Sequence, residues 1–514
     1  MPAGILLAMA YILALDQGTT GSTALVFGSD GTVLGRAYSE FKQHYPRPGW
    51  VEHEPEEIWR VSRRVMAAAI DDSAIDRREL AAIGITNQRE TTVVWDRETG
   101  LPVHRAVVWQ SRQSAKICAR LRSDGVEPIF REKTGLVLDP YFSGTKIRWI
   151  LDLDPALQKR AEAGELAFGT IDSWLLWKLT GGTAANSALH RTDPTNASRT
   201  LLYDIHQRRW DAELCEVLNV PLAMLPEVFP SAGVFAETEA FEGIPAGVPI
   251  AGIAGDQQAA LYGQGCWEPG QAKNTYGTGC FLVMNTGQNH RVSHHGLLTT
   301  VCCDAVGAPA YALEGSIFIA GAALQWLRDE LQIIDDASEA EGLALQIEDN
   351  EGVYLVPAFA GLGAPYWDAE ARGAILGLTR GSGRPHLARA ALESIAYQSR
   401  DVVEVMNRDS RIPLTELRVD GGACRSDFLM QFQADVLGVP VDRPALIETT
   451  AAGAAYLAGL AVGVWKNPSD LEQVRATEKR FEPGLADERR EELYGGWQRA
   501  VAQVRCAKAG DSDD

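Results

Sequence analysis

The chain has 514 residues, which is more than one compact core usually holds, so we expect two domains. A hydrophobic fraction of 46% and a charged fraction of 23% are ordinary for a globular protein. The formal net charge of −20 argues against a nucleic-acid partner, because phosphate backbones attract basic surfaces. No run of about 20 apolar residues occurs, so no membrane span is predicted.

The cysteines are typical of a cytoplasmic protein, and the N-terminal residues do not have the pattern of a secretion signal. Scattered thiols without a CxxC pair fit a reducing compartment better than a disulfide scaffold or a zinc site. No basic residue precedes Arg36, so Tyr11–Leu15 is interpreted as a buried strand after a tail, not as a secretion signal. A second tail is expected at Gly510–Asp514. The cysteines are Cys118, Cys215, Cys266, Cys280, Cys302, Cys303, Cys424 and Cys506.

The first half of the chain opens with short apolar runs that glycine-rich turns separate, which is typical of strands. A helix is expected to begin at Pro55, because proline suits the first helical position and the acidic Glu56 and Glu57 suit the first turn. The predicted strands are Tyr11–Asp16, Thr23–Phe27, Val33–Tyr38, Ala81–Thr86 and Thr91–Trp95.

The second half repeats the pattern of strands that end in glycine-rich turns and lead into helices, which favours an α/β architecture. Two strand ends with the dipeptide Asp-Gln, about half a chain apart, suggest an internal duplication. The segment Phe229–Val248, rich in Pro, Gly and Glu, is expected to be a loop. The predicted elements are strands at Val248–Ala254, Ala272–Thr286 and Leu414–Asp420 and a helix at Ser426–Leu437.

A phosphate site is predicted at the first of these turns, Asp16-Gln17-Gly18-Thr19-Thr20. The chain has neither GxxxxGK[ST] nor GxGxxG, so another phosphate-binding design is needed. Gly18 lets the backbone turn tightly and present N–H groups, and Thr19 and Thr20 add hydroxyl donors. Asp16 can hold Mg²⁺ through water, since Mg²⁺ keeps much of its hydration. The alternative is an Asx-type hairpin turn.

Two further glycine turns in the second half can contact a nucleotide. Gly277-Thr278-Gly279 can grip phosphates from the side opposite the first turn, although alone it is an ordinary turn. Asp420-Gly421-Gly422-Ala423 ends a strand, and glycine there allows close approach of a flat purine.

A substrate hydroxyl group can be recognised by Arg89, Glu90 and Asp256. Arg89 donates in a fixed fork and Glu90 accepts, so together they can read vicinal hydroxyls; the alternative is a surface ion pair. Asp256 ends an apolar strand and can accept a proton from a hydroxyl; the alternative is a helix N-cap. Trp109 and Phe281 can form apolar walls, or simply belong to the core.

Taken together, these motifs resemble the FGGY carbohydrate kinases. The resemblance covers the chain from Tyr11 to about Trp497 and repeats the family's motifs in order. The matching stretches are Ala14–Thr20, Gly49–His53, Gly84–Thr91, Asp139–Lys146, Thr195–Thr200, Ala254–Ala260, Asn274–Phe281, Gly361–Trp367 and Arg418–Ala423.

The resemblance implies two ribonuclease-H-like, actin-like domains, residues 1–262 for polyol and phosphate and 263–514 for nucleotide, with the active site between them. It implies transfer of the ATP γ-phosphate to glycerol, giving sn-glycerol 3-phosphate, in glycerol uptake and catabolism. It also implies a cytoplasmic homodimer or homotetramer with no integral membrane association.

The site residues that the resemblance implies fall into three groups. Asp256 is the base and Asp16 organises Mg²⁺. Glycerol should contact Arg89, Glu90, Trp109, Tyr141, Asp256, Gln257 and Phe281. ATP should contact Thr19, Thr20, Gly21, Thr278, Gly321, Gln325, Gly422 and Ser426.

The chain departs from the family pattern at three places. Thr23 stands where the first turn often has Arg, so one basic phosphate contact is missing, and Ser426 replaces an Asn common near the adenine. Some members bind fructose 1,6-bisphosphate through an Arg-bearing loop, but here Phe235–Pro245 has no Lys or Arg, so no such inhibition is predicted. Others are activated by phosphorylation of a His in that loop, and no His lies between His206 and His290.

Two other functions compete with glycerol phosphorylation. One is an FGGY kinase for a longer polyol or a ketose, which the small pocket expected around Arg89 and Glu90 disfavours. The other is a non-catalytic, actin-like nucleotide-binding protein, which the presence of both Asp16 and Asp256 disfavours.

Overall fold

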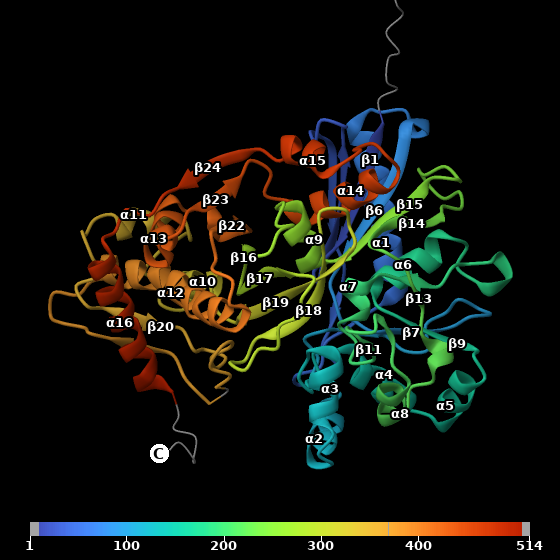
Figure 1. Cartoon of the computed structure of the whole chain (residues 1–514), viewed down its shortest axis with the longest axis horizontal. Helices are drawn as coiled ribbons and strands as arrows, with labels where there is room; N and C mark the ends of the chain where they lie inside the picture. Colours follow the sequence, from blue (N-terminus) through green and yellow to red (C-terminus); the bar gives the residue numbers. More distant parts are fainter. Residues whose placement is uncertain (1–9, 369, 506–514) are drawn as a thin grey trace, which may run out of the picture.

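The computed structural model describes residues 10–368 and 370–505. Apart from Ala10, the tails expected before Tyr11 and at Gly510–Asp514 lie outside the described residues. The first half of the chain, blue to green, forms the lobe on the right of Figure 1, and most of the second half, yellow to red, forms the lobe on the left.

The first lobe is built on a six-stranded sheet with the order β14-β15-β6-β1-β2-β3. The three central strands β15, β6 and β1 are parallel to one another, whereas β2, β3 and β14 are antiparallel to their neighbours. The strands are β1 (Tyr11–Gln17), β2 (Gly21–Phe27), β3 (Val33–Glu40), β6 (Leu80–Asn87), β14 (Ala232–Glu237) and β15 (Pro249–Gly255).

The central strands are apolar on both faces because helices cover both. Alternate side chains of β1 point to opposite faces, so Leu13 and Leu15 pack in one buried cluster with α1 (Pro55–Ser73) and α6 (Ile171–Leu179). Ile12 and Ala14 pack in the other cluster with α14 (Thr449–Ala461). The predicted first strands and the helix start at Pro55 are confirmed.

The second lobe holds a seven-stranded sheet with the order β18-β19-β17-β16-β22-β23-β24. Running from β19 to β24, its sequence of antiparallel and parallel neighbours repeats that of the first sheet from β3 to β14. The strands are β16 (Gln271–Tyr276), β17 (Cys280–Gly287), β18 (Leu298–Cys303), β19 (Pro309–Ile317), β22 (Glu416–Asp420), β23 (Val441–Pro444) and β24 (Thr477–Phe481).

The repeated topology agrees with an internal duplication, but the two turns that suggested it are not equivalent in the two sheets. Both Asp-Gln strand ends belong to the first sheet, at the ends of β1 and β15. The strand of the second sheet equivalent to β1 is β16, so the counterpart of the Asp16–Thr20 turn is the Tyr276–Gly279 turn. A dipeptide alone could not reveal this, because strand order depends on pairings between distant segments.

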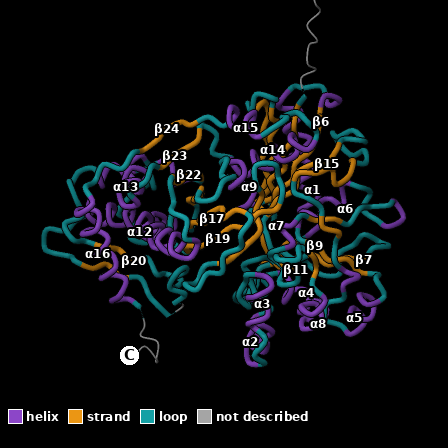
Figure 2. Tube along the Cα trace, in the orientation of Figure 1, coloured by secondary structure: helices purple, strands orange, loops and turns teal. Residues whose placement is uncertain are grey.

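Helices fill the space around and between the sheets, as the purple tubes of Figure 2 show. Helices α9 and α14 pack against each other where the lobes meet, while α10, α11, α12, α13 and α16 belong to the second lobe. The second-half helices are α10 (Gly321–Asp329), α11 (Glu339–Ala344), α12 (Arg384–Ser410), α13 (Asp427–Leu437), α15 (Pro468–Val474) and α16 (Asp487–Val504), and α9 spans Asp256–Gly263.

The remaining short elements form an insertion between β6 and β14 and small hairpins elsewhere. In the first half they are β4 (Gln43–His44), β5 (Glu52–His53), β7 (Val93–Asp96), β8 (Ala106–Val107), α2 (Ala115–Ser123), α3 (Glu127–Thr134), α4 (Ser143–Leu151), α5 (Pro155–Glu162), β9 (Leu166–Gly169), β10 (Arg191–Thr192), α7 (Pro194–Ala197), β11 (Tyr203–Asp204), β12 (Arg209–Trp210), α8 (Ala212–Leu218) and β13 (Glu227–Val228). In the second half they are β20 (Tyr354–Val356) and β21 (Ala374–Leu376).

The loop predicted over Phe229–Val248 is wrong in part, because β14 lies inside it. β14 is the edge strand beside β15, with an irregular register between Ala232 and Ala236. An edge strand needs only one partner and tolerates glycine and charged residues, so its composition resembles that of a loop.

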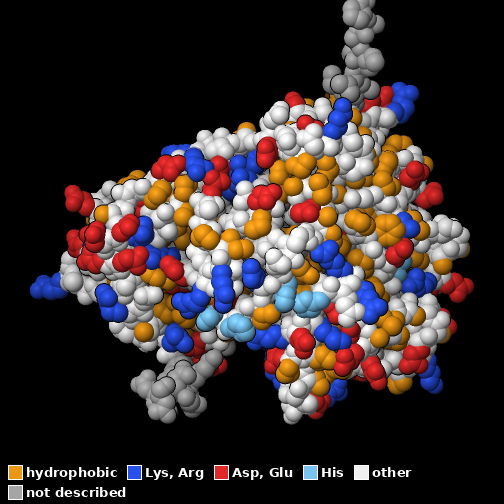
Figure 3. All heavy atoms as spheres, in the orientation of Figure 1, with side chains coloured by type: hydrophobic (Ala, Val, Ile, Leu, Met, Phe, Trp, Pro, Cys, Tyr) orange, Lys and Arg blue, Asp and Glu red, His pale blue; other side chains and the backbone are white. Residues whose placement is uncertain are grey.

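The surface carries charged side chains of both signs. In Figure 3 acidic and basic side chains are interspersed over much of the visible face. Within residues 10–368 and 370–505, no helix combines the length and apolarity that a bilayer crossing requires. The seven described cysteines, from Cys118 to Cys424, are buried free thiols that pack as small apolar side chains.

Candidate active site

Three polar segments meet at the carboxyl edge of the first sheet because β1, β6 and β15 are parallel neighbours. Asp16 in β1 is in register with Thr86 in β6, and Thr86 is in register with Ala254 in β15. Arg89 follows the end of β6, and Asp256 follows the end of β15. Ligands of open α/β sheets bind beyond such carboxyl ends, so this edge is the candidate site.

Arg89 is the centre of the site and is almost fully buried, with 2% of its surface exposed. Its Nε lies 3.1 Å from Oδ1 of Asp256, and Nη1 donates to Gln258 at 3.2 Å. Nη2 donates to the hydroxyl of Tyr141 at 3.4 Å, the longest of its hydrogen bonds. The alternative of a surface ion pair with Glu90 is therefore wrong.

A glycine makes room for the Arg89 side chain. A Cβ built on Gly255 would lie 2.7 Å from Cγ and 2.8 Å from Cδ of Arg89, which is closer than real contacts allow. The backbone N–H of Gly255 is in turn fixed by the hydroxyl of Thr195 at 2.8 Å. Gly255 thus leaves room for the Arg89 side chain, and the next residue, Asp256, forms the ion pair with it.

Glu90 is held in a backbone conformation that L-residues rarely adopt, with φ of 59°. Its carbonyl oxygen accepts hydrogen bonds from the hydroxyl of Ser143 at 3.0 Å and from Nζ of Lys146 at 3.3 Å. Burial raises the pKa of the Glu90 carboxyl group, while Arg199 beside it opposes that shift. A strained, buried acid held from several sides is typical of a functional position.

Asp256 is the first residue of α9, and Gly255 is the N-cap. The carboxylate accepts the N–H of the next residue, Gln257, at 2.7 Å, instead of an N–H one turn into the helix, so the N-cap alternative is wrong. This hydrogen bond and the closest contact with Arg89 both use Oδ1, which leaves Oδ2 available to a ligand.

Lys273 in β16 joins the two halves of the chain beneath Asp256. It is fully buried, and its Nζ donates to the side chains of Gln257 and Thr275. Burial lowers the pKa of Lys273, while the charges of Asp420 and Asp256 oppose that shift. The signal in the sequence is a lysine inside an apolar strand, which the motifs do not link to any site.

Of the two predicted aromatic walls, Trp109 lies beside other predicted site residues, and the position of Phe281 is known from its strand register. Trp109 is half-buried and its indole N–H donates to Oγ1 of Thr19 at 2.9 Å. Its ring lies edge-on to Tyr141, with 5.6 Å between the centroids. Phe281, also half-buried, sits in β17 opposite Thr275 and Ser316. Trp109 therefore connects the predicted phosphate turn to the predicted acceptor contacts.

Asp16 lies near Asp256, and the two carboxylates repel each other. Burial and the charge of Asp256 together raise the pKa of Asp16 to about 7. A cation beside Asp16 would offset this repulsion, and Mg²⁺ takes few protein carboxylates and keeps several waters. Among the described residues, no group of three or more potential metal-ligand side chains occurs.

The first phosphate turn closes the β1–β2 hairpin. The N–H of Gly18 donates to the carbonyl of Gly21 at 2.9 Å, and Thr20 at the tip is exposed. A Cβ on Gly21 would lie 2.7 Å from the ring of Tyr38, so glycine is needed for close packing there. The turn is thus a hairpin turn, but the N–H of Gly18 is bonded to a backbone carbonyl and not to the Asp16 side chain, so the Asx-type alternative is not seen.

The nucleotide contacts predicted in the second half cluster around one turn. The carbonyl of Gly277 accepts the N–H of Gly321 at 3.0 Å, which places the start of α10 against this turn. Gly421, with φ of 87°, packs on the backbone of Tyr276, where a Cβ would approach to 2.5 Å. The exposed members of this cluster are Thr278, Gln325 and Gly422.

Ser426 has a structural task, since its hydroxyl accepts the N–H of Leu429 as the N-cap of α13. Among the described residues, no hydrogen bond joins the first turn to the cluster around Gly277. The predicted phosphate contacts thus form two separate groups, one in each half of the chain.

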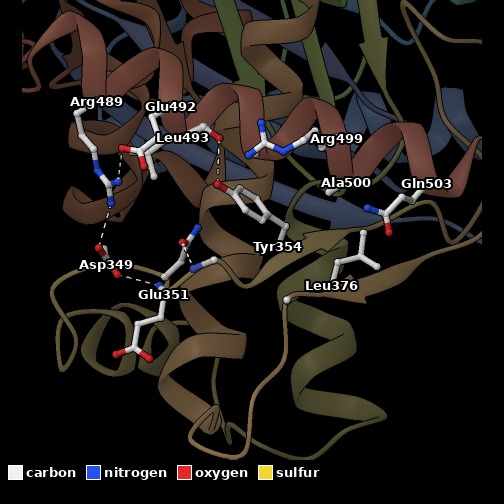
Figure 4. A pocket seen from close by; sticks show the side chains of 14 residues that line it. Asp349, Glu351, Tyr354, Leu376, Arg489, Glu492, Leu493, Arg499, Ala500 and Gln503 are labelled. Atoms are coloured by element: carbon white, nitrogen blue, oxygen red, sulfur yellow. Dashed lines mark hydrogen bonds and ion pairs between the residues drawn. The ribbon is translucent and has the colours of Figure 1, made fainter.

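A separate hollow of about 480 Å³ lies in the second lobe between α16 and the segment around β20. Figure 4 shows Tyr354 and Arg499 at its wall and the ion pair of Arg489 with Asp349 at one end. None of the predicted site residues lines it.

Comparison with known proteins assigns the chain to a family. The family models for the N-terminal and C-terminal domains of the FGGY carbohydrate kinases match residues 11–263 and 272–462. The chain belongs to the FGGY family of carbohydrate kinases. The resemblance seen in the motifs is therefore confirmed, and so is the two-domain α/β fold that it implied.

Curated relatives and a solved structure show which members of the family this chain is similar to. The chain is 57% identical to glycerol kinases of Listeria monocytogenes (serotype 4a, strain HCC23) and of Desulfitobacterium hafniense. The alignments cover 97% and 96% of this chain and 99% of each relative. The crystal structure of Plasmodium falciparum glycerol kinase with ADP is 34% identical, with a TM-score of 0.91 over 97% of this chain and 99% of that one.

A further structure shares the fold alone. The ligand-bound xylulose kinase of Lactobacillus acidophilus is 20% identical, with a TM-score of 0.85 over 96% of this chain and 99% of that one. Kinases with different acceptors thus use the same FGGY fold, and the acceptor has to be argued from the site.

Proposed function

We propose that this FGGY kinase transfers the γ-phosphoryl group of ATP to a terminal hydroxyl of glycerol, giving sn-glycerol 3-phosphate and ADP. The observation that carries the proposal is the Asp256–Arg89 pair at 3.1 Å, beyond the carboxyl ends of β6 and β15. Identity of 57% to glycerol kinases over nearly the whole chain supports glycerol as the acceptor.

In this proposal, the acceptor lies among Arg89, Glu90, Tyr141 and Asp256. Oδ2 of Asp256 accepts the proton of the attacking hydroxyl while Oδ1 stays bonded to Arg89 and the Gln257 N–H. The hydroxyl oxygen forms the new bond to phosphorus as the bond to the β-phosphate oxygen breaks, and ADP leaves. In phosphoryl transfer such a base chiefly orients the nucleophile.

The polar groups of Arg89 at the proposed acceptor position already have partners in the protein. The five N–H groups of Arg89 have close acceptors on Asp256, Gln258, Glu314 and Tyr141. Arg89 therefore offers glycerol no unpaired N–H group. A glycerol hydroxyl would instead share the Nη2–H group that donates weakly to Tyr141 at 3.4 Å. Its carbon chain would lie against Trp109, whose ring is half-buried beside Tyr141.

The nucleotide would be held from both halves of the chain. Thr19 and Thr20 would donate from the first turn, and Thr278, Gly321 and Gln325 from the cluster around Gly277. Asp16 would hold Mg²⁺ through water. When bound with ATP, Mg²⁺ would neutralise charge on the transferred group. We place the division between the polyol half and the nucleotide half at residues 262 and 263, where α9 ends.

Acceptor-dependent turnover tests the proposal. ADP formation from MgATP is measured with glycerol, with D-xylulose and without an acceptor, and the product is identified as sn-glycerol 3-phosphate by mass and stereospecific oxidation. We expect ADP formation to require glycerol. ADP formation that ignores glycerol would favour a nucleotide-binding protein without this acceptor, and faster turnover with D-xylulose would favour a kinase for a longer substrate.

A further inference from the structure

Glu314 brings a carboxylate from the second half of the chain into the candidate active site. It lies in the middle of β19, between Leu298 on one side and Val283 on the other, and is fully buried. Its two oxygens accept from Arg89 at 2.6 and 3.1 Å, which is a bidentate contact across the lobes.

Arg199 completes the arrangement. It follows α7 and is fully buried, and its Nη2 donates to Glu314 at 2.9 Å. Its Nε donates to Oε1 of Glu90 at 2.6 Å. Glu314, Arg89, Glu90 and Arg199 therefore form a closed ring of alternating charge, which the 3.8 Å contact between Nε of Arg89 and Oε1 of Glu90 completes. We call these four residues the buried charge ring.

Stability alone does not account for the buried charge ring. Taking four charged groups out of water is costly, and buried ion pairs are often no more stable than apolar residues of the same volume. Nη1 of Arg199 is also buried without a hydrogen-bond partner among the described residues. A network that is costly and incompletely paired is better explained by what it positions.

The ring fixes two of the residues that would contact the acceptor, Arg89 and Glu90. Glu314 takes up both Nη atoms of Arg89, so the guanidinium plane is set and Nε is directed to Asp256. Arg199 takes one oxygen of Glu90, and the rings of Tyr141 and Phe142 lie 5.6 and 5.2 Å from its guanidinium carbon. The attraction of the two arginines holds the pKa of Glu314 at about 2, so it is ionised at neutral pH.

We propose that Glu314 and Arg199 are positioning residues that hold Arg89 and Glu90 as one unit for the acceptor, and that this unit forms only when the two halves of the chain are in contact. The inference rests on the proposed function, because it assigns these residues to the acceptor side of that reaction. It predicts that substitutions of Glu314 and Arg199 change the KM for the acceptor and leave the KM for the nucleotide unchanged.

Glu314→Gln is the first test, and Glu393→Gln is its matched control. Glu393 is a buried glutamate of the same lobe. It pairs with Arg389 at 2.7 Å and accepts a hydrogen bond from Asn350, and it contacts none of the ring residues. Glu314→Gln keeps the side-chain shape but loses the charge that faces two arginines. We expect its KM for glycerol to rise at least tenfold, with KM for MgATP within about twofold of wild type and both constants unchanged in Glu393→Gln.

Arg199→Lys, with Arg389→Lys as control, tests the other side of the ring. Lysine keeps the charge but cannot bridge Glu90 and Glu314 as a fork does, so KM for glycerol should rise here too. Melting temperatures are measured for all variants. Equal glycerol KM values in the Glu314 and Glu393 variants, or loss of folding in both ring variants while both controls fold, would overturn the positioning role.

The outcome can be separated from a failure of the proposed function. If wild-type protein shows no glycerol-dependent turnover, the proposed function fails before any variant is compared. If wild-type protein turns glycerol over and Glu314→Gln has an unchanged KM for glycerol, the positioning role fails and the proposed function stands.

Discussion

Replacing Gly255 by Ala should damage the acceptor side of the site through a single methyl group. The added Cβ would lie 2.7 and 2.8 Å from Cγ and Cδ of Arg89, whereas ordinary contacts begin at 3.4 Å. To reach an ordinary contact, the added Cβ and Cγ of Arg89 must move apart by about 0.7 Å. A displacement of about 1 Å at a reacting site can cost about 100-fold in rate. We expect kcat/KM for glycerol to fall by about 10- to 100-fold.

Steady-state kinetics with glycerol and MgATP varied in turn check this expectation, beside thermal unfolding. Gly252→Ala is the matched control on the same strand: its Cβ would lie 2.5 Å from the backbone N of Ala458 in α14, away from Arg89. Both variants should lose about 1–3 kcal/mol of stability through overpacking. Only Gly255→Ala should lose affinity for glycerol. If the two variants show the same KM for glycerol, the conclusion that Gly255 positions Arg89 for glycerol binding is refuted.

Three further predictions concern the base, a buried acid and regulation. Asp256→Asn should lower kcat by about 10²–10⁴-fold with little change in KM for glycerol, because it removes the proton acceptor but keeps the shape; single-turnover kinetics would detect it, and a near-normal kcat would contradict the base assignment. Burial raises the pKa of Glu393 to about 7, against the opposing charge of Arg389. Because the folded pKa exceeds the unfolded one, the protonated form stabilises the fold at low pH, and this contribution, up to about 3 kcal/mol, is lost as pH rises through about 7. The melting temperature of Glu393→Gln relative to wild type should therefore increase between pH 5.5 and 8.5, and a pH-independent difference would contradict this. Fructose 1,6-bisphosphate should leave turnover unchanged, because residues 235–245 carry no Lys or Arg and Arg63 nearby is paired with Glu242 at 3.7 Å; a titration that shows strong inhibition would refute this.

Much of the first half of the site could be predicted because its residues end apolar strands. Asp16, Arg89 and Asp256 each follow a run of buried side chains, so their position at a sheet edge can be inferred without knowing the strand order. The burial of Arg89 could not be inferred in this way, because its partner Glu314 is 225 residues away in sequence.

Residues inside strands were missed for a related reason. Glu314 and Lys273 sit within β19 and β16, where a single charged residue in an apolar run normally indicates a solvent-facing side. In this protein these two charged side chains face the other lobe and not solvent. A single charged residue in an apolar strand therefore indicates a contact between the two halves of the chain. Arg199 lies in the matching stretch Thr195–Thr200, but that match assigns it no role, because an arginine after a short helix is ordinary in a surface loop.

The choice between base and N-cap for Asp256 also required coordinates. The two interpretations differ by one residue in where α9 begins, and helix ends are the least certain part of any sequence-based assignment. Once the helix is seen to start at Asp256 itself, the carboxylate is free of the capping role and can serve a ligand.

The repeated topology of the two sheets bears on how such an enzyme could acquire a new acceptor. Most of the proposed acceptor contacts, among them Arg89 and Asp256 after β6 and β15, lie in the first copy, while most predicted nucleotide contacts lie in the second. Inherited variation can therefore accumulate in one copy's turns without disturbing the grip on ATP in the other. Glu314 is the exception, since it belongs to the second copy but binds Arg89 of the first. A lineage that changed its acceptor by altering Arg89 would have to change position 314 as well, so these two positions should vary together among FGGY kinases of different substrate preference.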